Sequence, residues 1–176
     1  MPALFPAYDT LLHPIPNAGL FFRKIKWAWQ RVRRGYSDFD VSELQSWFAG
    51  VLPEMLAAFR ENAVGFPAPL LEKWYGAHKE ELGLSYGDFL ARKAPPRGED
   101  PYPRMEAECR QEWLGILGEM RRLFLEAGED TSSAQNPYPP TDRRFRETEE
   151  ERYRYRKECR EKAFALFCEW FDSLWQ

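Results

Sequence analysis

The sequence predicts an all-α protein, a single compact helical bundle of about five helices preceded by an extended, proline-containing N-terminal arm. Three observations predict it. Apolar side chains recur at helical spacing in several long segments, no segment alternates apolar with polar residues as a strand does, and valine and isoleucine are scarce. A chain of 176 residues can bury a core without disulfides or metals, so we expect a single domain over residues 1–176.

The extended arm is predicted over residues 1–19. This segment holds four prolines, whose spacing leaves no room for a helix. We expect its apolar side chains to pack onto the body of the protein; these are Leu4, Phe5, Leu11 and Leu12.

The first helix is predicted over residues 21–34, and Gly35 ends it. Asp38 or Asp40 is expected to cap the next helix, with Glu43 three residues after Asp40 as in a capping box. At roughly 100° per residue, the apolar residues of the first helix gather on one side: Phe21, Ile25, Ala28, Trp29 and Val32.

The second helix is predicted over residues 41–61, where one side is apolar and the opposite side carries glutamates. Pro53 lies in its middle and is expected either to kink the helix or to open a second segment. The apolar stripe comprises Val41, Leu44, Phe48, Val51, Leu52, Met55, Leu56 and Phe59.

The remaining helices follow from the same spacing and from glycine and proline breaks. They are predicted at 70–75, 86–92, 104–127 and 142–174. Residues 94–103 are expected to form a loop, and the polar segment 128–141 a flexible hinge loop.

Aromatic residues are unusually frequent for a hydrophilic chain. There are 7 Trp, 8 Tyr and 13 Phe, while the mean hydropathy is -0.64. This combination predicts dense aromatic seams beneath polar surfaces. Those on helix stripes are expected to build the core: Phe48, Phe59, Trp113, Phe124, Phe164, Phe167, Trp170 and Phe171. Four others lie off the stripes and are candidates for contact with a partner: Trp27, Trp47, Tyr153 and Tyr155.

Residues that could carry catalysis do not form a recognisable constellation. The two histidines, His13 and His78, stand far apart, and no glycine-rich phosphate loop is present. Three cysteines without a CxxC pair indicate reduced thiols. We therefore expect no enzyme activity, no cofactor and no metal site.

No segment reaches the roughly 18 uncharged apolar residues of a membrane helix. The first residues also lack the basic and apolar regions of a signal peptide. The expectation is a cytoplasmic protein without a membrane partner, and the sequence leaves its oligomeric state unknown.

The best-defined motif is RKIKWAWQRVRRG, residues 23–35, which holds six basic residues. Several of them share the side of the helix opposite the apolar stripe, and Trp27 falls among them. A tryptophan there can stack on a base or on an arginine, and the cations can hold phosphates. The motif predicts a phosphate- or partner-binding site comprising Arg23, Lys24, Trp27, Arg31, Arg33, Arg34 and Tyr36.

A structural explanation of the same motif stays open. Trp27 could cover a second packing contact while the arginines pair with acidic residues elsewhere in the chain. The acidic candidates are Glu43, Glu54, Glu61 and the run Glu149–Glu151.

Several blocks of the chain resemble a family of short uncharacterised proteins encoded in bacteriophage genomes. They are KIKWAWQRVRRGYSDFD (24–40), Leu52-Pro53 with Leu56, Gly65-Phe66-Pro67, EWLGILGEMRRLF (112–124) and LFCEWFDSLW (166–175). Family members show a basic aromatic helix, an arginine-glycine-aromatic turn with aspartates, and two later aromatic helices. The chain departs from the family at Val41-Ser42-Glu43, where members often have a tryptophan. The resemblance implies a phage origin and action in the host cell cytoplasm.

Together these features predict a non-catalytic, phage-type accessory protein. It is expected to bind a host or antiviral-defence component, with inhibition of that component as one possible outcome. The alternative is nucleic-acid or nucleotide binding, including ligand sequestration, through the basic-aromatic helix face.

Overall fold

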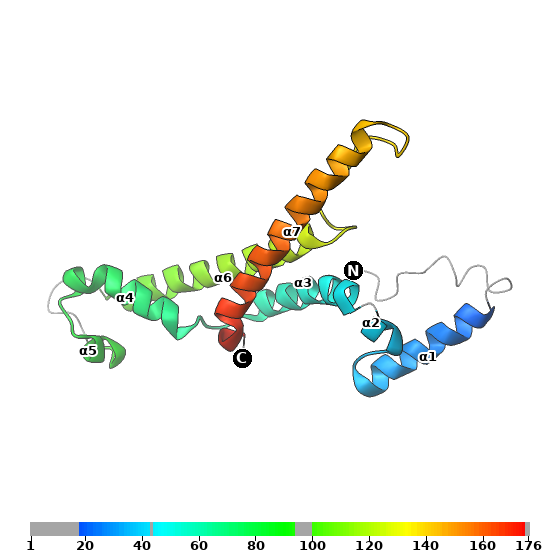
Figure 1. Cartoon of the computed structure of the whole chain (residues 1–176). Helices are drawn as coiled ribbons and strands as arrows, with labels where there is room; N and C mark the ends of the chain where they lie inside the picture. The colour runs from blue at the N-terminus through cyan, green and yellow to red at the C-terminus, as the bar shows by residue number, and fades with distance from the viewer. Residues whose placement is uncertain (1–17, 43, 94–99, 175–176) are drawn as a thin grey trace. The chain divides into compact units, whose positions relative to one another are not determined.

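The computed structural model describes residues 18–42, 44–93 and 100–174 (Figure 1). Within these ranges it is all-α, with seven α-helices, five of them at least seven residues long, and no strand. The predicted all-α class is confirmed for the described residues. The expected arm lies outside the described residues, apart from its last two residues, which begin the first helix.

Contacts along the chain divide it into two compact units, Met1–Phe48 and Ala49–Gln176. The described part of the first unit contains α1 (Ala18–Arg34), α2 (Asp38–Ser42) and the start of α3 (Leu44–Asn62). The sequence predicts one helix over 41–61; the described helices α2 and α3 extend from Asp38 to Asn62, and residue 43 between them lies outside the described residues. Pro53 lies inside α3 and opens no second segment. Val41, Leu44 and Met55, expected on one apolar stripe, are each 61% exposed.

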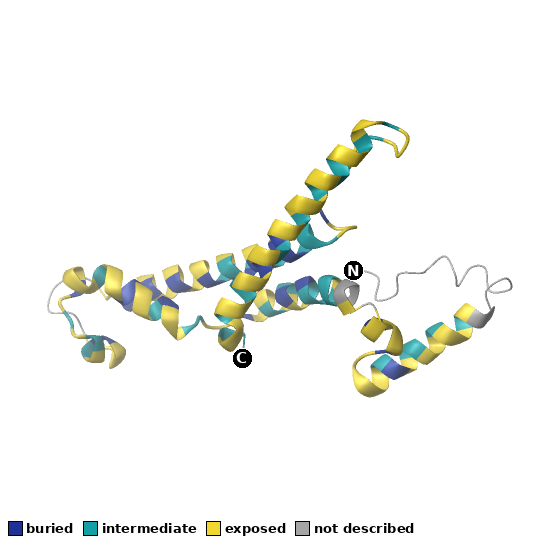
Figure 2. Ribbon diagram, in the orientation of Figure 1, coloured by how far each residue is buried: buried dark blue, intermediate teal, exposed yellow. Residues whose placement is uncertain are grey.

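The core of the second unit is built on α6 (Tyr102–Ala127), which begins two residues before the predicted start. Pro101 and Pro103 suit the first turn of a helix, where the missing N–H has no partner to lose. Figure 2 shows its buried positions recurring along the helix. They are Tyr102, Met105, Cys109, Trp113, Leu117, Met120, Leu123 and Phe124.

Three long helices contact α6 within the described part of this unit, and α3 does so through the Phe59 ring, 6.5 Å from that of Trp113. α7 (Arg144–Trp170) packs on it through ring pairs, with centroids 5.3 Å apart for Phe124–Phe164 and 5.5 Å apart for Trp113–Trp170. α4 (Ala68–Leu82) contacts its first half, where the Trp74 indole N–H donates to Glu108 at 2.7 Å. The predicted 70–75 helix was too short, because the chain stays helical until Gly83 adopts a left-handed φ of 58°.

The short helix α5 (Tyr86–Leu90) is capped by Ser85, whose hydroxyl accepts from the Asp88 N–H at 3.2 Å. Its Phe89 ring is almost fully buried and lies 5.4 Å from the Tyr102 ring. The predicted aromatic seam therefore exists here, although its members come from α4, α5 and α6.

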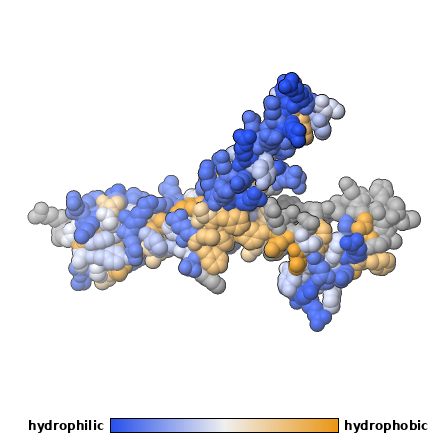
Figure 3. Space-filling view, in the orientation of Figure 1, coloured by the Kyte–Doolittle hydropathy of each residue, from blue (hydrophilic) through white to orange (hydrophobic). Residues whose placement is uncertain are grey.

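The last helix ends earlier than predicted, because the α-helix gives way to a 3-10 turn, η2 (Phe171–Ser173). Two residues expected in the core are partly outside it, with Phe164 40% and Phe171 51% exposed. Their exposure follows from the packing of α7, which meets α6 along one side. The half of α7 nearest the α6–α7 loop is hydrophilic over the face seen in Figure 3.

The segment 128–141, expected as a flexible hinge, is joined to both helices by hydrogen bonds. Glu126 of α6 accepts from the Ser133 N–H at 2.9 Å and from the Tyr155 hydroxyl of α7 at 3.2 Å. Asn136 donates to the Phe145 carbonyl at 3.1 Å, and Arg152 donates to the Ala134 carbonyl at 2.6 Å. These bonds connect α6 and α7 through the loop.

Candidate functional site

The predicted site residues lie on a hairpin formed by α1 and α2. Gly35 ends α1 with a left-handed φ of 81°, and its N–H donates to the Arg31 carbonyl at 2.9 Å. The turn is then fixed by Ser37, whose side chain is fully buried. The Asp40 N–H donates to the Ser37 hydroxyl at 3.2 Å, and the Ser37 N–H donates to the Asp40 carboxylate at 2.7 Å.

This reciprocal pair is a capping box in which Ser37 is the cap and Asp40 the acidic member. The predicted cap is therefore wrong, because the cap lies one position before Asp38 and three positions before Asp40. Ser37 has the ordinary side chain of an N-cap, but the two aspartates that follow it conceal this signal in the sequence.

Arg31 of α1 holds Asp40 in a bidentate pair. Its Nε lies 2.9 Å and its Nη2 2.5 Å from the two carboxylate oxygens. The hydrogen bonds from Arg31 lower the pKa of Asp40 to about 2, against the opposing effect of burial. The same pair raises the pKa of Arg31.

Asp38 forms a second, more exposed junction. The Gln30 amide donates to its carboxylate at 2.7 Å and accepts from its backbone N–H at 3.0 Å. Arg34 and Lys26 also contact the carboxylate, at 2.7 Å and 2.9 Å. The hydrogen bond from Gln30, followed by those from Arg34 and Lys26, keeps the pKa of Asp38 below its usual range.

Trp27 also faces α2. Its ring lies 4.7 Å from that of Phe39, and the Arg23 guanidinium stands 5.1 Å from the Trp27 ring. Arg34 is placed similarly over Tyr36, at 5.1 Å. The structural explanation of this motif predicts that Trp27 packs within the protein and that the arginines pair with acidic residues of the chain. Trp27 does lie against Phe39, and Arg31 and Arg34 do pair with carboxylates. Among the described residues, the acidic partners of Arg31 and Arg34 are Asp40 and Asp38, whereas Glu54 pairs with Arg121.

The seven predicted residues consequently do not form one open surface. Trp27, Arg31 and Arg34 meet α2, whereas Arg33 lies on another side of α1, with its guanidinium 5.2 Å from the Trp29 ring. Lys24 is half-buried. The Trp47 side chain lies outside what the structure describes.

The apolar side of α1 is open, which the sequence did not indicate. Four large side chains there are more than half exposed: Phe22 at 68%, Ile25 at 51%, Trp29 at 58% and Val32 at 88%. Figure 2 shows exposed positions over most of α1. Ile25, Trp29 and Val32 belong to the predicted stripe, whereas Phe22 does not, and Phe21 and Ala28 of that stripe are half-buried. Spacing alone does not say whether anything covers a side of a helix. We call the four exposed residues the α1 apolar face.

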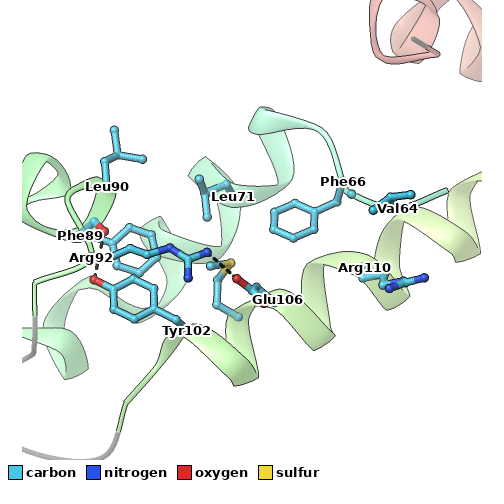
Figure 4. Close-up of a pocket in the computed structure, with 11 residues that line it drawn as sticks. Val64, Phe66, Leu71, Phe89, Leu90, Arg92, Tyr102, Glu106 and Arg110 are labelled. Carbon is cyan, nitrogen blue, oxygen red and sulfur yellow. Dashed lines mark hydrogen bonds and ion pairs between the residues drawn. The ribbon is translucent and has the colours of Figure 1, made fainter. Parts of the chain in front are cut away.

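A second feature is a pocket of about 440 Å³ in the second unit (Figure 4). Its walls are mostly apolar and include Phe66, Leu71 and Leu90. The polar groups along it already have partners. Arg92 pairs with Glu106 at 2.5 Å, and Arg110 donates to the Ala63 carbonyl at 3.2 Å. The pocket therefore presents an apolar wall with an ion pair, without a nucleophile and base in contact.

Within the described parts of the chain, no three histidine, cysteine or carboxylate residues lie close enough to hold a metal ion. None of the described helices is long and apolar enough to cross a membrane.

Comparison with family models, with curated proteins and with solved structures finds no match. The likeness to phage-encoded proteins accordingly remains a prediction from the sequence motifs.

Proposed function

We propose that the protein is a non-catalytic accessory protein that acts by binding, and that the α1 apolar face makes the contact. The exposure of its four large side chains supports this proposal. They are spaced three and four residues apart, so they form one continuous strip along the helix. Proteins rarely expose such a strip unless it meets a partner.

Charge indicates what the partner presents. α1 contains six basic residues and no acidic one. Arg33 borders one edge of the apolar face, and Lys26, next to it, pairs with Asp38 at 2.9 Å. The complementary partner is an apolar surface bordered by negative charge. The resemblance to phage proteins makes this partner a host or antiviral-defence component.

Nucleic-acid or nucleotide binding through Arg23, Trp27, Arg31 and Arg34 has less support. Arg31 and Arg34 already pair with Asp40 and Asp38, and Trp27 lies against Phe39. A phosphate would have to displace these carboxylates, which occupy the same hydrogen-bond donors.

A photo-crosslinking amino acid tests the proposal in host cells. Val32 on α1 and Val64 in the second unit are matched positions, with exposed fractions of 88% and 83%. We expect adducts with a host component from position 32 and none from position 64, and Trp29→Asp should remove them. Equal adducts from both positions, or none from position 32, would contradict the proposal.

A further inference from the structure

We infer that the partner of the α1 apolar face is an anionic lipid surface, on which α1 lies parallel to the membrane plane. This inference rests on the proposed function, since it names the chemistry of what the same face binds. The observations are the shape of the apolar face, the distribution of charge along the chain and the pairing of the cations that face α2.

The apolar face has the dimensions of an interfacial helix. At roughly 100° per residue, its four members span an arc of about 80°, and the half-buried Phe21 and Ala28 widen the apolar side to about 120°. The helix α1 is about 25 Å long. Such a helix buries its apolar side in the boundary between headgroups and acyl chains without crossing the bilayer. The sequence prediction of no membrane partner rests on the lack of a spanning segment, which this mode of binding does not need.

The aromatic and basic residues at the edge of this face suit the same boundary. Trp29 and Phe22 are large rings, and Arg33 lies beside them with its guanidinium 5.2 Å from the Trp29 ring. Indole rings favour the headgroup level of a bilayer, and arginine and lysine side chains extend from an apolar surface to reach phosphates.

Charge is also distributed unevenly along the chain. Residues 1–48 carry six Lys and Arg against four Asp and Glu, while residues 49–176 carry nineteen against twenty-four. An anionic surface therefore attracts the first unit and repels the second. The attraction is concentrated on the unit that bears the apolar face.

An anionic surface fits these observations better than a nucleic acid does. Phosphate binding by a helix needs its cations on an open polar side. On α1 that side faces α2, where Asp38 and Asp40 hold Arg34 and Arg31. The side left open is apolar with Arg33 at its border, and a lipid surface offers acyl chains to the apolar residues and phosphates to the guanidinium.

The test is flotation of the full chain with vesicles made of equal parts phosphatidylglycerol and phosphatidylcholine, compared with vesicles of phosphatidylcholine alone. We expect the full chain to bind the anionic vesicles at low salt. Its affinity should be about tenfold lower for the neutral vesicles. It should also be about tenfold lower for the anionic vesicles in about 1 M NaCl, where charges are screened within about 3 Å. Val32→Asp and Trp29→Asp should each abolish flotation. Met55→Asp, at an equally accessible apolar residue of α3, 61% exposed, is the control and should leave flotation unchanged.

Circular dichroism of the three variants checks that the helices stay folded. Val32 is the most exposed residue of the α1 apolar face, so Val32→Asp is the substitution least able to disturb α1. Failure of the wild-type chain to float, or equal loss in Met55→Asp, overturns the inference. If flotation fails while position 32 still crosslinks to a host protein, the partner is a protein and the proposed function stands. If both fail, the α1 apolar face is not a binding surface. Binding to an oligonucleotide without binding to vesicles would also overturn the lipid inference.

Discussion

Arg31 and Asp40, nine positions apart, form a bidentate ion pair that closes the α1–α2 hairpin, with the Asp40 side chain only 4% exposed. Asp40 also accepts from the Ser37 N–H. One carboxylate thus satisfies a guanidinium of α1 and a backbone donor at the start of α2, and its removal should loosen both.

Asp40→Asn should destabilise the hairpin by about 2 kcal/mol, because it removes a charged acceptor and leaves the Arg31 guanidinium without its partner. Hydrogen exchange of the amides from Arg31 to Val41 measures the effect. Asp38→Asn is the matched control, since its carboxylate is half exposed and solvent can replace the lost bonds. Equal acceleration of exchange in the two variants would contradict the central place of Asp40.

Acid should weaken the same hairpin. The pKa of Asp40 is about 2 in the folded protein and near 3.8 in an unfolded chain. The contribution of the ionised Asp40 carboxylate to the stability of the hairpin is therefore complete above a pH of about 4 and is lost as the pH falls toward 2. Exchange rates in the wild-type hairpin should approach those of Asp40→Asn over that interval. If the exchange rates of the wild type and Asp40→Asn still differ at a pH of about 2, the stabilisation does not come from the ionised Asp40 carboxylate.

Two glycines should respond to alanine with opposite signs. Gly35 has a φ of 81° with no atom within 4 Å of an added Cβ, so Gly35→Ala should cost about 1 kcal/mol through backbone strain alone. Gly115 is inside α6, also with open space, and Gly115→Ala should stabilise by about 0.5 kcal/mol. Exchange in α1–α2 measures the first, and urea unfolding measures the second. A gain in stability at Gly35 would mean that the turn does not need the left-handed conformation.

The loop between α6 and α7 should depend on Glu126. Glu126→Ala removes the acceptor for Ser133 and Tyr155, so proteolysis within residues 129–136 should become faster. Glu129→Ala is the control, because this side chain is 84% exposed and only reaches Arg156 at 4.0 Å. If the two variants are cleaved at the same rate, the hydrogen bonds to Glu126 do not hold the loop.

The sequence by itself determined the helical class and most helix positions. Both depend on local properties, namely apolar spacing, the φ preference of Gly35 and Gly83, and the prolines beside Tyr102. The sequence also placed three of the four residues of the α1 apolar face, Ile25, Trp29 and Val32, on one side of the helix. The tertiary structure decided that Arg31 and Arg34 pair with Asp40 and Asp38, because glutamates farther along the chain were alternative partners in the sequence. It also decided that Trp113 is buried while Trp29 is exposed. Burial depends on which neighbours other segments supply, and periodicity within one helix carries no information about them.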